Sequence, residues 1–575
     1  MSTAQSATAS IDAHTLTEAQ PGQTTDVSEQ PKLEKSESKK SSTPDEYADT
    51  EKQDVEEDDE SRFVTGKKLV LIFVGFLSSV FLIALDQTIV STALPRIVSQ
   101  FNALSQVTWV VSAYFLTQAG FMLTAGQLLT VTSTKKIYLV SITIFEIGSL
   151  ICGVAKSMEV LIFGRAFAGV GAACIFVSVL SIISEITRLK DRPVLMGTFG
   201  GIFALASVLG PLLGGAFTDH VSWRWCFYIN LPFGALAIGA VVFFLEDRRP
   251  RVKPNHVGLT TLQLWKKIDV IGSILCLGMV CALLLPLQWG GQEKEWNDKV
   301  VIALFCVFGV LLAMFIGWEY YMGEDAILPL FLLKNSTQCG AALDAFFMFL
   351  GLLLATYYLP LKYQAQGHSA TKSGIDILPF QLACVFTAMG SGGIINFTGR
   401  YWPFLVGSPL LVSLASGLLY TINETTPNAR VIGYQIILGV GVGGALQNVV
   451  IAIQAEYAHA EHMVPQTTAV VTWAQLLGGI IGIAIAGTVF ANGLKANLPS
   501  TLPPEVALAV RRSVSVIFTL PEDVRAEVVH AYIKSIDQVF LVGVPAGVLA
   551  SLSAFLVKNH NLKHRSAMQS GAGMI

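Results

Sequence analysis

Four ionisable side chains interrupt long apolar stretches of this sequence, and each could carry charge or a proton through a membrane interior. They are Asp86, Glu146, Arg165 and Asp344. A charge at the centre of a bilayer costs about 3 kcal/mol or more, so such residues usually mark an ion or substrate path. Asp86 lies about six residues before the end of its stretch, and Arg165 about five residues after the start of its own, so at ~1.5 Å per residue both are roughly 8–9 Å deep. Matching depth predicts that these two can pair directly.

An Asp–Arg pair in a membrane has two interpretations. In the first, Asp86 takes up and releases a proton while Arg165 tunes its proton affinity, because burial favours the neutral acid and a nearby cation favours the carboxylate. Helix motion that changes their separation would then load and unload the proton. In the second, a permanent ion pair only fixes helix packing. We favour proton coupling through Asp86 and Arg165, with Glu146 as a further candidate.

Other polar side chains are candidates for a substrate cavity. Glu146 either faces such a cavity or bonds within a helix interface, and Asp344 either lines the cavity or is partly solvated near the inner surface. Gln447 and Gln454 are seven residues apart and therefore share a helix face. Aromatic groups with few hydrogen-bonding partners suit bulky amphipathic ligands, although Trp109 alternatively anchors at the membrane surface. The cavity candidates are Trp109, Tyr114, Gln118, Asp344, Gln447, Asn448, Gln454 and Gln475.

The elements that position these residues are predicted to be membrane-spanning helices. Hydrophobic residues make up 52% of the chain and charged residues 14%, and the mean hydropathy is +0.57. Soluble proteins carry about 25% charged residues. Fourteen apolar stretches are long enough to span a bilayer. They are 69–92, 107–130, 137–155, 160–184, 194–218, 225–246, 268–288, 299–319, 340–361, 374–395, 403–421, 432–453, 468–492 and 536–557.

A weak internal repeat suggests how these stretches are grouped. The loop after 107–130 and the loop after 374–395 share a Gly-rich basic pattern, and the stretches 194–218 and 468–492 are both rich in glycine. Such repeats are common in transporters. We therefore predict an all-α polytopic membrane protein with two six-helix bundles and two extra central helices. The predicted parts are an acidic tail (1–66), an N-terminal bundle (67–250), a linker with two inserted helices (251–335), a C-terminal bundle (336–557) and a C-terminal tail (558–575).

Charge distribution predicts the orientation. Residues 1–60 contain sixteen Asp and Glu against five Lys and almost no large apolar residues, which predicts a disordered tail. Lys and Arg concentrate in the loops on the side of the termini, which places both termini in the cytoplasm. Asn423 then lies in an Asn-x-Thr sequence of an outside loop and is a candidate for glycosylation. The eight cysteines form no Cys-x-x-Cys pair, which argues against a zinc site or a disulfide framework.

Residues 210–215 read Gly-Pro-Leu-Leu-Gly-Gly inside an apolar stretch. Glycine and proline weaken helices in water, but in membranes neighbouring helices compensate and small residues allow close approach. The segment resembles the antiporter motif of the major facilitator superfamily, which assigns that motif to Gly210, Pro211, Gly214 and Gly215. Three further segments resemble the fourteen-span drug:proton antiporters of that superfamily, in their fungal form. They are LDQTIVSTALP at 85–95, GRAFAGVG at 164–171 and WRWCFYINLP at 223–232. One departure is that Thr130 and Val131 replace the acidic residue and arginine of a family loop.

The resemblance implies a proton-coupled antiporter that exports small amphipathic molecules such as drugs, toxins or secondary metabolites by alternating access. Alternatives are proton-coupled uptake of a chelate such as a siderophore, vacuolar transport of basic amino acids, and a transporter-like receptor that signals through its tail. No phosphate-binding loop or catalytic triad is evident, so we expect no enzyme activity and no cofactor, with the proton gradient as the energy source. The expected partners are the substrate, protons and lipid, without nucleic acid or metal. We expect a monomer in the plasma membrane, or alternatively the vacuolar membrane.

Overall fold

The computed structural model describes residues 63–101, 106–248, 253–290, 294–423, 426–500, 502–512 and 514–569. All of them belong to one compact unit, Val55–Ile575. The predicted disorder of residues 1–60 concerns residues outside the described ranges. Within those ranges the regular secondary structure is helical, and no β-strand forms beyond one isolated bridge between Gly290 and Lys294.

The first half of the described chain forms a bundle that is built around α5. Its helices are α2 (Gly66–Phe101), α3 (Val107–Val131), α4 (Thr134–Val154), α5 (Met158–Ile186), α6 (Arg192–His220), α7 (Trp225–Tyr228) and α8 (Asn230–Phe244). Helix α5 packs against α3 and α4, and α2 packs against α6 and α8. The apolar stretch predicted at 225–246 is divided into α7 and α8 at Ile229, shortly before Pro232, which cannot donate a backbone hydrogen bond.

The second half forms a corresponding bundle. Its helices are α12 (Ser336–Ala365), α13 (Ala370–Asp376), α14 (Leu378–Thr398), α15 (Trp402–Tyr420), α16 (Asn428–Ala445), α17 (Asn448–Glu456), α18 (Val464–Asn497), α19 (Pro504–Arg512), α20 (Glu522–Phe540), α21 (Gly543–Ala554) and α22 (Leu562–Gln569). Helix α12 packs against α18 and α21, and α16 packs against α14 and α15. The helix expected over 432–453 is interrupted at residues 446–447, so it consists of α16 and α17. Four glycines directly before this break (Gly439, Gly441, Gly443 and Gly444) weaken the helix there.

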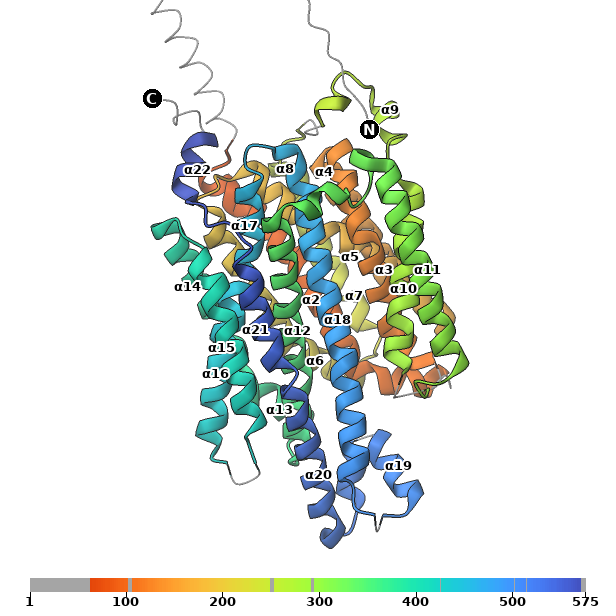
Figure 1. Cartoon of the computed structure of the whole chain (residues 1–575). Coiled ribbons are helices and arrows are strands. Elements are labelled where there is room, and N and C mark those ends of the chain that lie inside the picture. Colours follow the sequence, from red (N-terminus) through yellow and green to blue (C-terminus); the bar gives the residue numbers. More distant parts are fainter. Residues whose placement is uncertain are drawn as a thin grey trace, which may run out of the picture. The chain divides into compact units, whose positions relative to one another are not determined.

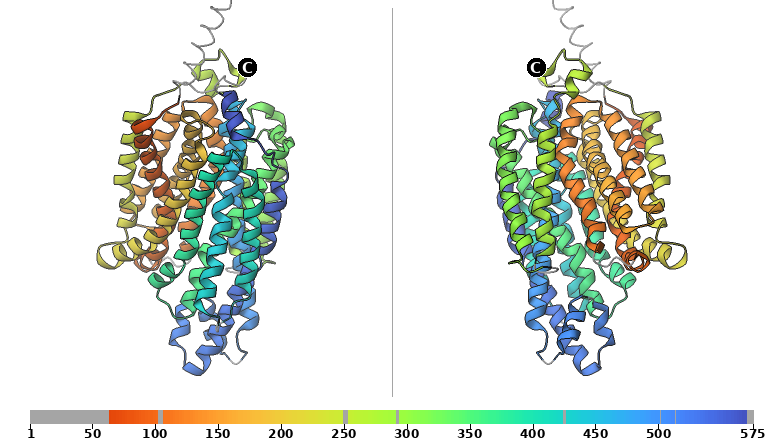
Figure 2. Two further views of the ribbon diagram at one scale, coloured as in Figure 1. Left: turned by 90° about the vertical axis from the view of Figure 1, so that its left-hand side faces the viewer. Right: turned by 90° about the vertical axis from the view of Figure 1, so that its right-hand side faces the viewer.

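The insertion between the halves contains α9 (Thr261–Trp265), α10 (Val270–Trp289) and α11 (Lys299–Met322). Helix α10 packs against α3 and α18, one helix of each bundle, and α11 packs mainly against α10. The two bundles meet directly where α6 lies against α14 and α3 against α18. Figure 1 shows α10 and α11 at the right-hand edge of the bundles, and the right-hand view of Figure 2 looks onto this side. The predicted arrangement of two six-helix bundles with two extra helices is confirmed.

Both ends of the described chain lie on one side of the bundles, which we call the tail side. The Val64 amide donates to the Ile186 carbonyl at the end of α5 (2.9 Å). Asn396, at the end of α14, donates to a carbonyl of the α5–α6 connection (2.6 Å). The amide of Leu562, the first residue of α22, donates to Gly399 directly after α14 (3.0 Å). Figure 1 shows α9 and α22 at this same side, and α19 with part of α20 projecting at the opposite, far side.

Thirteen helical segments among the described residues are long and apolar enough to cross a membrane. The predicted stretch 107–130 corresponds to α3, which is 25 residues long but is not among those thirteen. Its polar side chains, including Gln118 and Gln127, lower its hydropathy. Because the described chain begins and ends on the tail side, the number of crossings must be even. Parity therefore favours α3 as the fourteenth crossing.

Candidate functional site

A buried ion pair joins α2 and α5 within the N-terminal bundle. The Arg165 guanidinium on α5 contacts Asp86 Oδ2 on α2 at 2.5 Å, and the two side chains are 2% and 0% exposed. Arg165 Nε also donates to the Val110 carbonyl of α3 at 3.0 Å. The Arg165 guanidinium carbon lies 4.4 Å from the centroid of the Tyr114 ring. The direct pair expected from matching depth is thus present, and three helices hold it. Its role in proton coupling stays a prediction.

Asn230 supports this pair from a fourth helix. It begins α8, and its Nδ2 lies 3.4 Å from Asp86 Oδ1 and 3.0 Å from Ser149 Oγ on α4. The Asn230 side chain is fully buried. An amide donor stabilises a carboxylate without adding charge, so Asn230 fixes one carboxylate oxygen while Arg165 fixes the other. We did not single out Asn230 from the sequence, although it belongs to the segment WRWCFYINLP that carried the family resemblance.

Glu146 lies at the interface between α4 and α8. Both its carboxylate oxygens are buried without a hydrogen-bond partner. A Cβ atom added to Gly234 of α8 would overlap the Glu146 carboxylate, so the absence of a side chain at Gly234 makes room for it. Of the two interpretations left open by the sequence, this position favours the helix interface over a cavity. An unpartnered buried carboxylate is costly when ionised, which suits a group that holds a proton.

The Gly-Pro motif brings α6 against the helix that carries Asp86. A Cβ atom at Gly210 would overlap the Thr88 hydroxyl, and one at Gly214 would overlap the Ile89 carbonyl oxygen. Thr88 Oγ1 in turn donates to the Ala206 carbonyl of α6 at 3.1 Å. These contacts begin only two residues beyond Asp86 on α2. Close approach of α2 and α6 therefore depends on glycine at two of the motif positions.

The other two motif residues differ from Gly210 and Gly214. A Cβ atom at Gly215 would meet nothing within 4 Å. Pro211 lies inside α6, which continues as one helix from Arg192 to His220. Because proline lacks a backbone donor, one hydrogen bond of this helix is lost there.

Helix α6 also forms the contact with the other bundle. A Cβ atom at Gly197 would lie 2.6 Å from the Ala388 carbonyl oxygen of α14, and one at Gly392 of α14 would overlap the Pro193 carbonyl. Glycine on both helices thus permits backbone-to-backbone packing. Through α6, the helix of Asp86 is connected to the C-terminal bundle by contacts that contain few flexible side chains.

On the tail side, Arg192 and Gln454 join the two bundles. Arg192, at the start of α6, is 2% exposed and donates to the Ser184 carbonyl (2.6 Å) and to Gln454 Oε1 (3.2 Å). Gln454 of α17 is fully buried, and its Nε2 lies 3.4 Å from the Leu180 carbonyl of α5. We expected Gln454 to line a cavity with Gln447, but its amide is used between the bundles. Arg192 was not among the residues singled out from the sequence.

The remaining cavity candidates differ in their surroundings. Asn448 donates to Ser391 Oγ (3.0 Å) and to the Gly444 carbonyl, and therefore stabilises the break before α17. Trp109 packs against Trp289 of α10 with ring centroids 5.8 Å apart. The other candidates are buried in the interior: Tyr114 and Gln118 on α3, Gln447 before α17, and Gln475 on α18.

Asp344 and the pair Lys362–Asp537 are further buried charges in the C-terminal bundle. Asp344 of α12 is 0% exposed, and neither of its carboxylate oxygens has a hydrogen-bond partner. The expected partial solvation of Asp344 is therefore wrong, because the neighbouring helices cover the carboxylate completely. Lys362 of α12 pairs with Asp537 of α20 at 2.5 Å, with side chains 4% and 9% exposed. This pair is not evident from the sequence, because the two residues are far apart in the chain and near the ends of their stretches.

The two lysines at the start of α4, directly after the α3–α4 loop, form their contacts within the N-terminal bundle. Lys135 donates to the carbonyls of Val242 (3.1 Å) and Leu245 at the end of α8, and Lys136 pairs with Asp247 at 3.0 Å. A hydrogen bond from Ser133 and the ammonium of Lys136 lower the pKa of Asp247. The start of α4 therefore caps α8 without the acidic residue and arginine of the family pattern. Among the described residues, no group of three or more His, Cys, Asp or Glu side chains could hold a metal ion.

Comparisons with known proteins agree with this architecture. The sequence is 40% identical over 515 residues to the MFS-type transporter astH of Aspergillus oryzae, covering 89% of this chain and 90% of that protein. It is 42% identical over 455 residues to the MFS-type efflux pump MFS1 of Trichophyton rubrum, covering 78% and 83%. It is 38% identical over 507 residues to the rubrofusarin-specific efflux pump aurT of Gibberella zeae, covering 88% and 92%.

Two solved structures share the fold at low sequence identity. The proton:xylose symporter XylE superimposes with a TM-score of 0.57 at 12% identity, covering 88% of this chain and all of that one. The human organic anion transporter MFSD10 gives a TM-score of 0.52 at 13% identity, covering 86% of this chain and all of that one. Residues 76–483 match the sequence pattern of the Major Facilitator Superfamily. With the two bundles and the relatives named above, this match establishes that the chain belongs to the Major Facilitator Superfamily.

Proposed function

We propose that this protein is a proton-driven efflux transporter that exports small amphipathic molecules by alternating access. The observation that carries the proposal is the buried Asp86–Arg165 pair, whose helix packs directly on the glycine motif of α6. Several relatives at about 40% identity are named efflux pumps. We therefore propose toxins or secondary metabolites as the class of exported substrates.

Protonation of Asp86 is the proposed coupling step. A proton on Asp86 removes the negative charge that Arg165 and Asn230 now stabilise. Arg165 would then rely on the Val110 carbonyl and the Tyr114 ring, so α2 and α5 lose their strongest mutual attraction. Displacement of α2 acts on α6 through the glycine contacts, and α6 acts on α14 of the other bundle. The two bundles would thereby change their relative tilt.

Other buried polar groups support the transport of charged or amphipathic cargo. Glu146 and Asp344, with buried carboxylate oxygens that lack partners, are proposed to bind protons. Gln118, Gln447 and Gln475 are proposed to contact substrate along the path between the bundles. We propose further that the tail side is cytoplasmic, that the monomer is active in the plasma membrane, and that exposed Asn423 on the far side is glycosylated.

The test uses full-length protein in liposomes, with rhodamine 6G and ethidium as transported dyes and an imposed pH gradient. The variant Asp86→Asn preserves shape but cannot exchange a proton, and Asp247→Asn, a surface carboxylate on the tail side, serves as the matched control. We expect gradient-driven transport by wild type and Asp247→Asn and its loss in Asp86→Asn. Full gradient-driven transport by Asp86→Asn would refute the coupling role. Dye movement by wild type that ignores the gradient would instead indicate a facilitator.

A further inference from the structure

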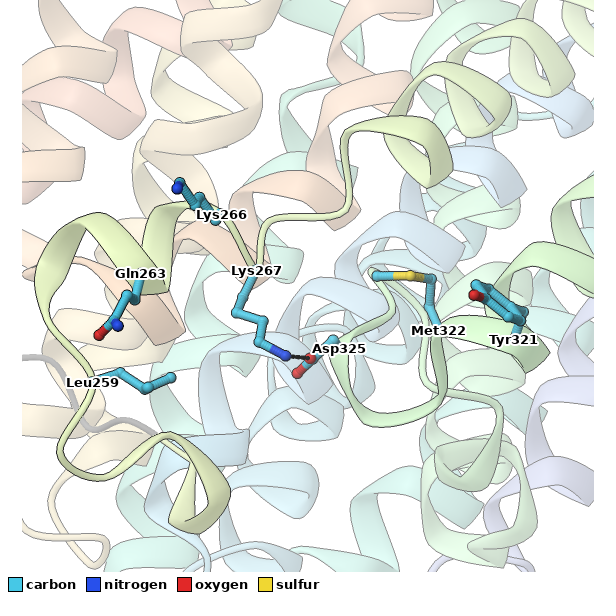
Figure 3. A pocket seen from close by; sticks show the side chains of 7 residues that line it. All are labelled: Leu259, Gln263, Lys266, Lys267, Tyr321, Met322 and Asp325. Carbon is cyan, nitrogen blue, oxygen red and sulfur yellow. Dashed lines mark hydrogen bonds and ion pairs between the residues drawn. The ribbon is translucent and has the colours of Figure 1, made fainter.

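A groove opens on the tail side between the segment around α9 and the end of α11, away from the ion pair. It has a volume of about 760 Å³ and is lined by Leu259, Gln263, Lys266, Lys267, Tyr321, Met322 and Asp325. Figure 3 shows Lys267 reaching to Asp325, with Leu259 and Gln263 to one side and Met322 and Tyr321 to the other. The lining thus combines basic, polar and apolar side chains.

The charges of this groove leave one lysine in excess. Asp325 accepts from Lys267 at 3.1 Å, and its other carboxylate oxygen lies 2.9 Å from His256 Nε2. The negative charge of Asp325 is therefore already neutralised by Lys267 within the protein. The ammonium of Lys266 is exposed and makes no hydrogen bond or ion pair with any residue that the structure describes. An anion that enters the groove meets Lys266 as a free cationic partner.

Exposed apolar side chains lie on α9 and at the end of α11, the two segments that border the groove, at the level where two membrane helices end. Helix α10 begins at Val270 and α11 ends at Met322, so the groove lies at the boundary of the bilayer. Leu262 is 70% exposed, Trp265 46% and Tyr321 78%. Tryptophan and tyrosine favour the headgroup region of a membrane, where their rings are buried and their polar atoms hydrated. At a membrane surface, lipid would cover these apolar side chains. In water alone they would stay exposed to solvent.

We propose that this groove binds an anionic phospholipid of the tail-side leaflet. The lipid phosphate lies against Lys266 and Gln263, and the glycerol and upper acyl chains lie against Leu259 and Met322. Basic pockets beside membrane helices on the cytoplasmic side bind acidic headgroups in this manner. A phospholipid explains both the free cation and the apolar rim, whereas soluble phosphate would leave the rim without a partner. This inference is independent of the proposed export activity.

The proposal is tested by native mass spectrometry of the full-length protein, titrated with phosphatidylserine or phosphatidylcholine. Lys266→Ala removes the free cation, and Lys334→Ala removes an exposed lysine of the α11–α12 connection outside the groove as a matched control. One lysine near an anionic surface corresponds to about a fivefold change in binding. We expect Lys266→Ala to weaken phosphatidylserine binding by about this factor, with Lys334→Ala and phosphatidylcholine binding unchanged.

Two further arms separate charge from shape and lipid from phosphate. Lys266→Arg keeps the cation and should retain phosphatidylserine binding. Glycerol 3-phosphate carries the same phosphate without acyl chains and should not compete with the lipid at equal concentration. Equal phosphatidylserine affinity of wild type and Lys266→Ala, or an equal loss in Lys334→Ala, would overturn the proposal. Effective competition by glycerol 3-phosphate would show a phosphate site and overturn the assignment to a lipid.

Discussion

Gly214→Ala and Gly215→Ala are adjacent substitutions for which the packing of α6 predicts opposite outcomes. Both replace glycine in the same helix, and both gain about 1 kcal/mol of helix propensity. At Gly215 the new methyl group enters open space. At Gly214 it overlaps the backbone carbonyl of Ile89 as well as the Thr92 hydroxyl. Unlike a side chain, the Ile89 carbonyl cannot rotate away, so the helices themselves must separate.

The size of the effect follows from the required movement. Non-bonded heavy atoms need a separation of about 3.5 Å, so α6 must retreat from α2 by about 1 Å. Overpacking of this kind costs about 1–3 kcal/mol, and the shared propensity gain cancels between the two variants. We therefore expect Gly214→Ala to be less stable than Gly215→Ala by about 1–3 kcal/mol.

The two variants are compared by thermal unfolding in detergent and by gradient-driven dye export from liposomes. Gly214→Ala should melt at a lower temperature and export more slowly, because the retreat of α6 also strains the hydrogen bond from Thr88 to Ala206. Gly215→Ala should match wild type in both assays or exceed it in stability. Equal melting temperatures and equal export rates for the two alanine variants would refute the packing argument.

Three further predictions concern other contacts. Gln454→Leu removes an acceptor of Arg192, and a hydrogen bond to a charged group is worth about 1.5–3 kcal/mol. Amide hydrogen exchange at the start of α6 should therefore accelerate. Unchanged exchange would mean that this contact does not hold the bundles together. Lys362→Ala leaves Asp537 buried without its partner and should lower the free energy of unfolding by about 3–5 kcal/mol. The double variant with Asp537→Ala should recover part of this loss. Strictly additive decreases in melting temperature would contradict coupling between the two residues. Asn423→Gln should increase the electrophoretic mobility of protein made in fungal cells, whereas an unchanged band would show that the site carries no glycan.

The sequence was sufficient to predict the bundle architecture and the Asp86–Arg165 pair. Hydrophobic length locates a span, and counting residues from its end gives the depth of a charge, so two charges at one depth can be matched without a structure. Asn230 and Arg192 could not be found in this way. Asn230 lies inside the stretch 225–246 but is uncharged, so the matching of charges by depth passes over it, and Arg192 lies just before the stretch 194–218. Each acts through helices that approach only after the bundle has packed.

Gln454 illustrates a limit of prediction from helical periodicity. Helical spacing places Gln447 and Gln454 on one face, but it does not say what that face meets. The break between α16 and α17 separates the two residues, and α17 presents Gln454 to Arg192 of the other bundle. Asp344 is a similar case, because its position along the chain left a cavity and partial solvation both open, whereas the surrounding helices bury its side chain fully. Depth is encoded locally, whereas the neighbours of a side chain are decided by tertiary packing.

The route from the ion pair to the other bundle is defined by backbone packing rather than by surface charge. Thr130 and Val131 stand where the family loop carries an acidic residue and an arginine, and the lysines after them cap α8 within their own bundle. The contacts that cross between the bundles at α6 are instead glycine-to-backbone contacts and the bonds of Arg192. Where backbones touch directly, as at Gly197 and Gly392, a displacement is transmitted with little loss, because no side chain lies between them at these positions. Movement of α2 on protonation of Asp86 would therefore reach α14 through α6 without a charged lock in that loop.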